Sequence, residues 1–108
     1  MFGNLGKMMR IAGELKRRMP EIREHLQETY FTGAAAEGQI AARVNGRGEL
    51  AEVSIAPELL AAGADAAVLS EQVTAAVAEA QAQAAVAVRE AMLEITGGEE
   101  LPEMSGLL

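Results

Sequence analysis

Apolar residues recur at alternating spacings of three and four through the N-terminal part of the chain, which is the pattern of an amphipathic helix. We predict this helix over residues 4–26. Its apolar stripe consists of Leu5, Met8, Ala12, Leu15, Met19, Ile22 and Leu26. Pro20 lies in this stretch and has no N–H to donate to the carbonyl of Lys16. We therefore expect a kink or a broken turn near residues 17–20, and not the end of the helix, because the stripe continues in phase.

After this helix the apolar residues alternate with others at every second position, which predicts β-strands. Residues 29–32 form a short β-rich run that ends at Gly33, and residues 34–38 have the composition of a loop. The next strand has one apolar face, formed by Ile40, Ala42 and Val44. The dipeptide Asn45-Gly46 then predicts a hairpin with a type I′ turn, which needs a positive φ at both central residues.

The strand that returns from this hairpin alternates as well. We predict that its inner face holds Ala51, Val53 and Ile55 and that its outer face holds Leu50, Glu52 and Ser54. One face of the antiparallel sheet is therefore apolar and the other mixed, so helices should cover only one side of it.

The C-terminal half of the chain is predicted to be helical. Residues 57–60 begin with proline and form a short helical turn, which Gly63 ends. Asp65 is a candidate N-cap for one long helix over residues 66–96, which contains no glycine or proline. Its predicted buried side consists of Leu69, Val73, Ala76, Val77, Ala80, Ala84, Ala87, Val88, Ala91, Met92 and Ile95. Residues 97–108 are expected to form a flexible tail.

The length of this helix bears on the assembly. A helix over residues 66–96 is about 46 Å long at about 1.5 Å per residue, whereas a compact chain of this size is roughly 35 Å across. Helices of this length typically pack on another chain. We therefore predict an α+β fold with a single domain over residues 1–96. It consists of an N-terminal helix, a three-stranded antiparallel meander and a long C-terminal helix, assembled as an elongated homodimer.

The composition argues against several kinds of chemistry. The 108 residues include no cysteine, one histidine (His25) and three aromatic residues. Thiol chemistry, a His-based metal cluster and an aromatic platform for single-stranded nucleic acid are therefore not expected, and no nucleophile–base pair is recognisable. No apolar run is long enough to span a bilayer, and the N-terminus does not resemble a secretory signal. We expect a cytoplasmic protein that is not an enzyme, needs no cofactor or metal, and does not bind membranes.

Charge is distributed unevenly along the chain. The net charge is −7, yet residues 1–26 carry six basic and three acidic side chains, a balance of +3 that leaves −10 for residues 27–108. The basic residues of this N-terminal segment are Lys7, Arg10, Lys16, Arg17, Arg18 and Arg23. Such asymmetry indicates contact with nucleic acid or another anionic surface. The alternative is a solvated helix face on which Glu14–Arg18 and Arg17–Glu21 pair at i,i+4.

Four short motifs occur in order along residues 2–96. They are the opening Met1-Phe2-Gly3-Asn4-Leu5, Thr32-Gly33, the hairpin Val44-Asn45-Gly46-Arg47-Gly48-Glu49-Leu50, and Pro57-Glu58-Leu59-Leu60. As an ordered set they resemble the YbaB/EbfC family of nucleoid-associated proteins. The resemblance implies a cytoplasmic homodimer that binds DNA through protruding helices without catalysis. Two residues depart from the family pattern: Ala56 stands where an Asp usually precedes the Pro-Glu-Leu-Leu segment, and Pro20 interrupts the basic helix.

Two functions remain open at this point. The first is non-specific or weakly specific binding of duplex DNA by a nucleoid-associated homodimer, through the six basic residues of the N-terminal helix. The second is a protein-interaction module that acts with DNA-metabolism proteins and uses its Met-rich helix, with little DNA binding of its own.

Overall fold

The computed structural model describes residues 2–96, with side chains described for residues 4–94. Its elements in order are α1 (Phe2–Glu28), β1 (Tyr30–Ala35), the 3₁₀ turn η1 (Ala36–Gly38), β2 (Ile40–Asn45), β3 (Leu50–Ile55), α2 (Pro57–Ala61) and α3 (Ala66–Thr96). The predicted α+β architecture is confirmed. The predicted tail, residues 97–108, lies outside the described residues.

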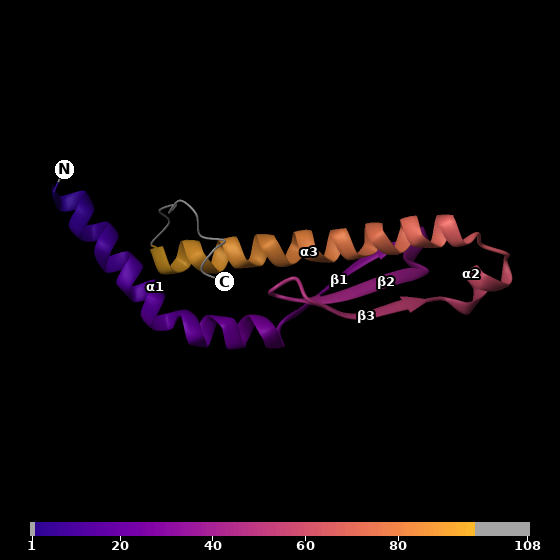
Figure 1. The fold of residues 1–108 in the computed structure, drawn as a ribbon, viewed down its shortest axis with the longest axis horizontal. Helices are drawn as coiled ribbons and strands as arrows, with labels where there is room; N and C mark the ends of the chain where they lie inside the picture. The colour runs from indigo at the N-terminus through magenta and orange to yellow at the C-terminus, as the bar shows by residue number, and fades with distance from the viewer. Residues whose placement is uncertain (1, 97–108) are drawn as a thin grey trace.

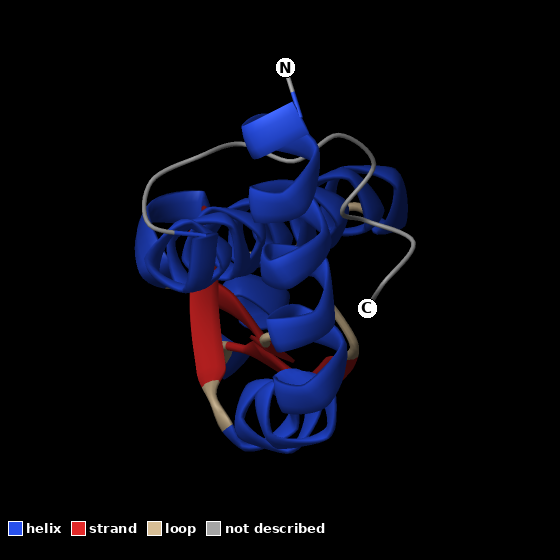
Figure 2. Cartoon of the chain, turned by 90° about the vertical axis from the view of Figure 1, so that its left-hand side faces the viewer, coloured by secondary structure: helices blue, strands red, loops and turns tan. Residues whose placement is uncertain are grey.

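The strands form an antiparallel meander in the order β1-β2-β3, and α3 runs along one face of it (Figure 1). Seen from the end of the molecule, the strands lie beneath α3 (Figure 2). The helix packs mainly on β1 and β2, so β3 forms the edge of the sheet away from it. The helix α3 covers only one face of the sheet, as predicted. The chain is elongated, measuring 65 × 24 × 18 Å.

Small residues bring α3 very close to the sheet. Ala76 and Ala80 are fully buried, and they lie over the apolar face of β2 that Ile40, Ala42 and Val44 form. On β1, a Cβ placed at Gly33 would lie 2.1 Å from the Ala76 carbonyl oxygen and 2.5 Å from the Ala80 nitrogen. The close packing of α3 on the sheet therefore requires both the alanines of α3 and the glycine of β1, because neither surface has room for a larger side chain.

The structure corrects the predicted end of β1. The strand does not stop at Gly33 but continues through Ala35, which pairs with Ile40. The predicted loop is thereby reduced to a tight connection in which Ala36, Glu37 and Gly38 all have positive φ. The strand continues in spite of its loop-like composition because each further residue that pairs with β2 satisfies backbone N–H and C=O groups.

The hairpin is where predicted, but its turn is not type I′. The N–H of Asn45 donates to the Glu49 carbonyl, and Gly48 is the only residue between them with a positive φ, of 80°. The three intervening residues therefore form the wider loop in which a left-handed glycine follows a type I turn. Gly46 serves another purpose: its N–H donates to the Leu26 carbonyl at 2.8 Å, and an added Cβ would lie 2.7 Å from Leu26 Cδ2. This contact attaches the end of α1 to the hairpin.

The Asn45 side chain organises this turn, and its removal should be costly. Its Oδ1 accepts hydrogen bonds from the N–H groups of Arg47 and Glu49, each 3.0 Å long, and its Nδ2 donates to Glu49 Oε1 at 2.7 Å. Because Asn45 is 9% exposed, Asn45→Ala would leave part-buried donors without partners. We expect a loss of about 2 kcal/mol in the free energy of unfolding, measured by urea titration. Glu49→Ala removes one of the three bonds and should cost less than half as much.

A β-bulge interrupts the predicted alternation of β3. Val53 and Ile55 pair with Ala42 and Ile40 and share their face, as predicted. Between Arg43 and Val44 the register shifts, so that Val44 pairs with Leu50 and Ala51 has no partner of its own. The predicted alternation is therefore interrupted at this end of the strand, where Leu50 pairs with the buried Val44 and Ala51 is the extra residue.

No residue of β3 is buried, although its inner face is apolar. Leu50 remains 53% exposed, and Val53 and Ile55 are each 36% exposed. Since α3 does not reach across to this edge, the apolar face of the sheet continues beyond the helix that covers it.

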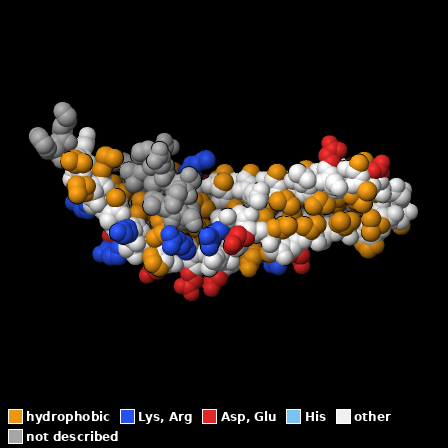
Figure 3. Space-filling view, viewed as in Figure 1, with side chains coloured by type: hydrophobic (Ala, Val, Ile, Leu, Met, Phe, Trp, Pro, Cys, Tyr) orange, Lys and Arg blue, Asp and Glu red, His pale blue; other side chains and the backbone are white. Residues whose placement is uncertain are grey.

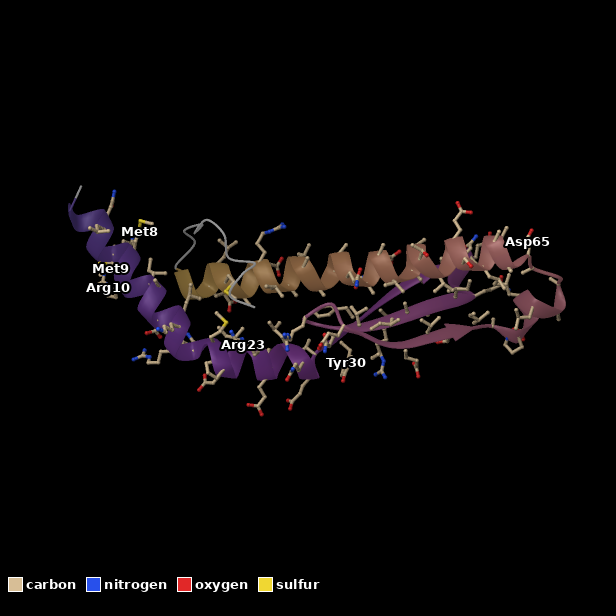
Figure 4. The ribbon with its side chains drawn as sticks, viewed as in Figure 1. Met8, Met9, Arg10, Arg23, Tyr30 and Asp65 are labelled. Carbon is tan, nitrogen blue, oxygen red and sulfur yellow. The ribbon has the colours of Figure 1, made fainter. Side chains whose placement is uncertain are left out.

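The helix α1 is continuous through Pro20, and its ribbon bends part-way along (Figure 1). The bend lies between Arg10 and Arg23 (Figure 4), which agrees with the kink predicted at the proline. Around it, Leu15 and Met19 pack against Met92 of α3 and are nearly fully buried. The helix is therefore held at two places, by α3 near its middle and by the hairpin at its C-terminal end.

Two helix starts follow the sequence closely. The Oδ1 atom of Asp65 accepts a hydrogen bond from the N–H of Ala67 at 2.8 Å, which confirms the predicted N-cap of α3. Ala56, at the start of α2, provides no side-chain cap. Proline at the first position compensates in part, because its φ already suits the helix.

Candidate nucleic-acid interface

The six basic residues singled out in the sequence all lie on α1, and all have exposed side chains. Each residue of a helix turns by about 100°, which places Arg10 and Arg17 on the face opposite the apolar stripe, with Lys7 and Arg18 beside them. Lys16 and Arg23 lie along one flank of the stripe.

The bend at Pro20 divides these cations unequally. Residues 4–18, which we call the basic arm, contain five of them and one acid, Glu14, giving 5 − 1 = +4. Residues 19–28 contain Arg23 and three glutamates, giving 1 − 3 = −2. Figure 1 shows the first part of α1 diverging from α3, and in Figure 3 the basic side chains gather over the α1 half of the molecule. The positive surface is therefore concentrated before the bend, and Arg23 lies beyond it in an acidic stretch.

Internal ion pairs occupy little of the basic arm. Arg17 pairs with Glu14, three residues earlier, instead of with Glu21 as the solvated-face alternative required. Among residues 2–96, no ion pair involves Arg10, Lys16 or Arg18. An exposed pair of the Arg17–Glu14 type is worth about 0–1 kcal/mol. The arm therefore retains cations that can contact an external anion.

The arm is also apolar in part. Leu5, Met8 and Met9 are 58%, 44% and 68% exposed, and Figure 4 shows both methionines on the diverging part of α1. The predicted stripe is continuous in sequence, but the residues of the stripe that pack with Met92 of α3 are Leu15 and Met19, and Ile11 is the first residue of α1 that packs against this cluster. The N-terminal end of the stripe is thus left uncovered within the described part of the chain.

One cluster on the outer face of the sheet was not anticipated. The Arg43 guanidinium lies 4.7 Å from the centre of the Tyr30 ring, and its Nε is 4.0 Å from Glu52 Oε1. Sequence reasoning missed it because the three residues come from three strands and meet only in the observed register. A cation over an aromatic ring at an exposed site is worth about 0.5–1 kcal/mol, and we regard the cluster as stabilising the sheet.

Residues 2–96 include no helix that is both long enough and apolar enough to cross a lipid bilayer. The same residues contain no cluster of acidic and histidine side chains arranged to hold a metal ion.

Comparison with known proteins identifies the family. The model of the YbaB/EbfC DNA-binding family matches residues 1–99, nearly the whole chain. The chain belongs to this family. Similar proteins include a nucleoid-associated protein of Legionella pneumophila (strain Corby), 33% identical over 57 residues, and one of Chlorobaculum parvum, 37% identical over 57 residues. Each match covers 53% of this chain and 51% of the relative, so it spans about half the length of either protein.

The fold of this YbaB/EbfC chain also occurs in a solved structure. The crystal structure of an uncharacterized protein from Helicobacter pylori superposes with a TM-score of 0.63, covering 75% of this chain and 93% of that one. At 18% identity the likeness concerns the fold alone.

Proposed function

We propose that this protein binds duplex DNA as a homodimer, without catalysis and with little sequence preference, and that it is associated with the nucleoid. The observation that carries the proposal is the concentration of +4 on a projecting helical arm, in which Arg10, Lys16 and Arg18 form no ion pair with the described residues. Membership in a DNA-binding family and the names of the relatives support it.

Acidic residues at the far end of the chain do not oppose this binding. The molecule is 65 Å long, whereas electrostatic interactions in physiological salt are screened over about 8 Å. Phosphates near the basic arm therefore interact with cations such as Arg10, Lys16 and Arg18 and are shielded from acids at the far end. Binding of this kind gains its free energy from the release of counterions and depends steeply on salt.

The uncovered face of the sheet supports the dimer. An apolar band lies along the right-hand half of the molecule in Figure 3, between α3 and β3. The exposed residues of β3 on this side of the sheet include Leu50, Val53 and Ile55. Monomers seldom expose contiguous apolar surfaces of this kind, and a second copy would cover them while presenting a second arm.

A salt series tests the DNA proposal directly. In the triple variant Arg10→Gln, Lys16→Gln, Arg18→Gln we expect DNA affinity to fall about a hundredfold at low salt. The slope of log K against log salt, expected near −4 to −5 for the parent protein, should lose most of its magnitude, because the variant removes three cations from each of the two arms. Fluorescence anisotropy with a labelled duplex at several salt concentrations measures both quantities.

The control removes the same charge from elsewhere in the chain. Arg43→Gln, Arg47→Gln, Arg89→Gln also lowers the net charge by three but leaves the arm intact, so its affinity should change less than about threefold. Equal losses in the two triple variants would show that overall charge, and not the arm, governs binding.

A protein-interaction module remains the second candidate function. The exposed Leu5, Met8 and Met9 favour it, because adaptable methionine-rich surfaces suit protein partners. If the arm variant binds DNA as tightly as the parent, this second function replaces the first.

A further inference from the structure

The basic arm offers a ligand two things at once. It carries +4, and near Lys7 and Arg10 it also exposes the apolar side chains of Leu5, Met8 and Met9. A phosphate backbone satisfies the charge but does little to remove the apolar side chains from water. A peptide that is both acidic and apolar would satisfy both, and its burial of the methionines would add the hydrophobic term that DNA lacks.

Residues 97–108 of this chain have that composition. They contain Glu99, Glu100 and Glu103, four large apolar residues and no lysine or arginine, so their charge complements that of the arm. The apolar residues are Leu101, Met104, Leu107 and Leu108.

The segment also begins in the right place. It follows α3 directly after Thr96, four residues beyond Met92, which packs against Leu15 and Met19 of α1. From Leu15 to Leu5 the helix is about 15 Å long at about 1.5 Å per residue. An extended chain gains about 3.3–3.6 Å per residue, so residues 97–108 are long enough to follow the arm to its N-terminal end.

We propose that residues 97–108 dock on the basic arm of the same chain, with their glutamates on the cations and their apolar residues on Leu5, Met8 and Met9. The segment then competes with DNA for the arm and lowers its affinity. The docking of residues 97–108 does not depend on the proposed function, whereas their competition with DNA rests on it. A second copy or another protein on this surface is an alternative that the experiments separate.

Paramagnetic NMR tests the docking without DNA. Because the sequence contains no cysteine, Ser105→Cys provides a single position for a spin label in the full chain. We expect the label to broaden the amide signals of residues 5–18 at low salt, while those of α2 stay sharp. Glu99→Gln, Glu100→Gln, Glu103→Gln in the labelled chain should reduce the broadening, and so should 1 M salt, at which screening acts over about 3 Å.

Isotope mixing distinguishes the occupants. When spin-labelled chains without ¹⁵N are mixed with unlabelled ¹⁵N chains, broadening of residues 5–18 would show that the segment reaches another copy, which overturns docking within one chain. Absence of broadening in the doubly labelled chain at low salt would overturn the proposal altogether.

DNA affinity tests the competition. The triple Glu→Gln variant of residues 99, 100 and 103, without a spin label, should bind duplex DNA about tenfold more tightly than the parent at low salt. The matched control Glu37→Gln, Glu58→Gln, Glu71→Gln raises the net charge equally and changes exposed residues remote from the arm, so it should change affinity less than about twofold. Equal gains in both variants would overturn the competition. If NMR shows docking but no variant binds DNA, the DNA proposal fails and the docking stands.

Discussion

Gly33→Ala is expected to unfold the protein or to lower its free energy of unfolding by at least about 3 kcal/mol, the upper end of the usual cost of overpacking. The added Cβ would lie 2.1 Å from the Ala76 carbonyl oxygen and 2.5 Å from the Ala80 nitrogen. Both are backbone atoms in the middle of α3, so no side chain can rotate to make room. The helix would have to move away from β1, exposing the apolar face of β2. Urea unfolding followed by circular dichroism measures the loss.

The same substitution elsewhere should have the opposite effect. A Cβ on Gly13 meets nothing within 4 Å, and Gly13 lies inside α1. Because alanine favours a helix interior by about 0.8–1.0 kcal/mol relative to glycine, Gly13→Ala should stabilise the protein by about that amount. If Gly33→Ala unfolds at the same urea concentration as the parent, the close approach of α3 to β1 is wrong.

The elements that were predicted correctly are those that local pattern determines. The helix α3 occupies residues 66–96 as expected, because its stretch contains no glycine or proline and Asp65 can cap it. The inner face of β2 follows directly from its alternation. Periodicity shows which residues share a face of a helix or strand, and it is sufficient to predict each of these elements.

The errors in the sheet all depend on contacts between distant residues. Asn45-Gly46 predicts a hairpin correctly, but the loop has three residues with a left-handed Gly48, and Gly46 instead contacts Leu26 of α1. The bulge at Ala51 likewise depends on the pairing of Val44 with Leu50. A shift of one residue reverses the face of each following side chain, so an alternation read from sequence does not hold across that end of β3.

The candidate site was predictable in composition but not in shape. Charge counting located the basic segment, and Pro20 indicated a bend. The same two facts place Arg23 beyond the bend in an acidic stretch. Charge counting could not show that Leu5 and Met8 stay exposed while Leu15 and Met19 are buried against Met92 of α3. That difference depends on where α1 meets α3, which no spacing within α1 encodes.

Val53→Glu should convert the proposed dimer into a monomer. Val53 is on the apolar face of the sheet yet 36% exposed, so a single chain can place a carboxylate there in water. A symmetric dimer that covered this face would bury the new charge twice, at a cost of several kcal/mol for each ion. Light scattering should give the parent a mass of about twice 11.3 kDa and the variant a mass of 11.3 kDa.

The control introduces the same residue one position further along. Ser54 pairs with Ala41 and points to the opposite face of the sheet, so Ser54→Glu should remain dimeric. Since one chain presents one arm, the monomeric Val53→Glu should also bind duplex DNA about a hundredfold more weakly, through loss of the second attachment. A monomeric Val53→Glu with parental DNA affinity would separate the two proposals, because each arm would then act alone. A dimeric Val53→Glu would place the subunit interface elsewhere and leave the apolar edge of β3 without its proposed occupant.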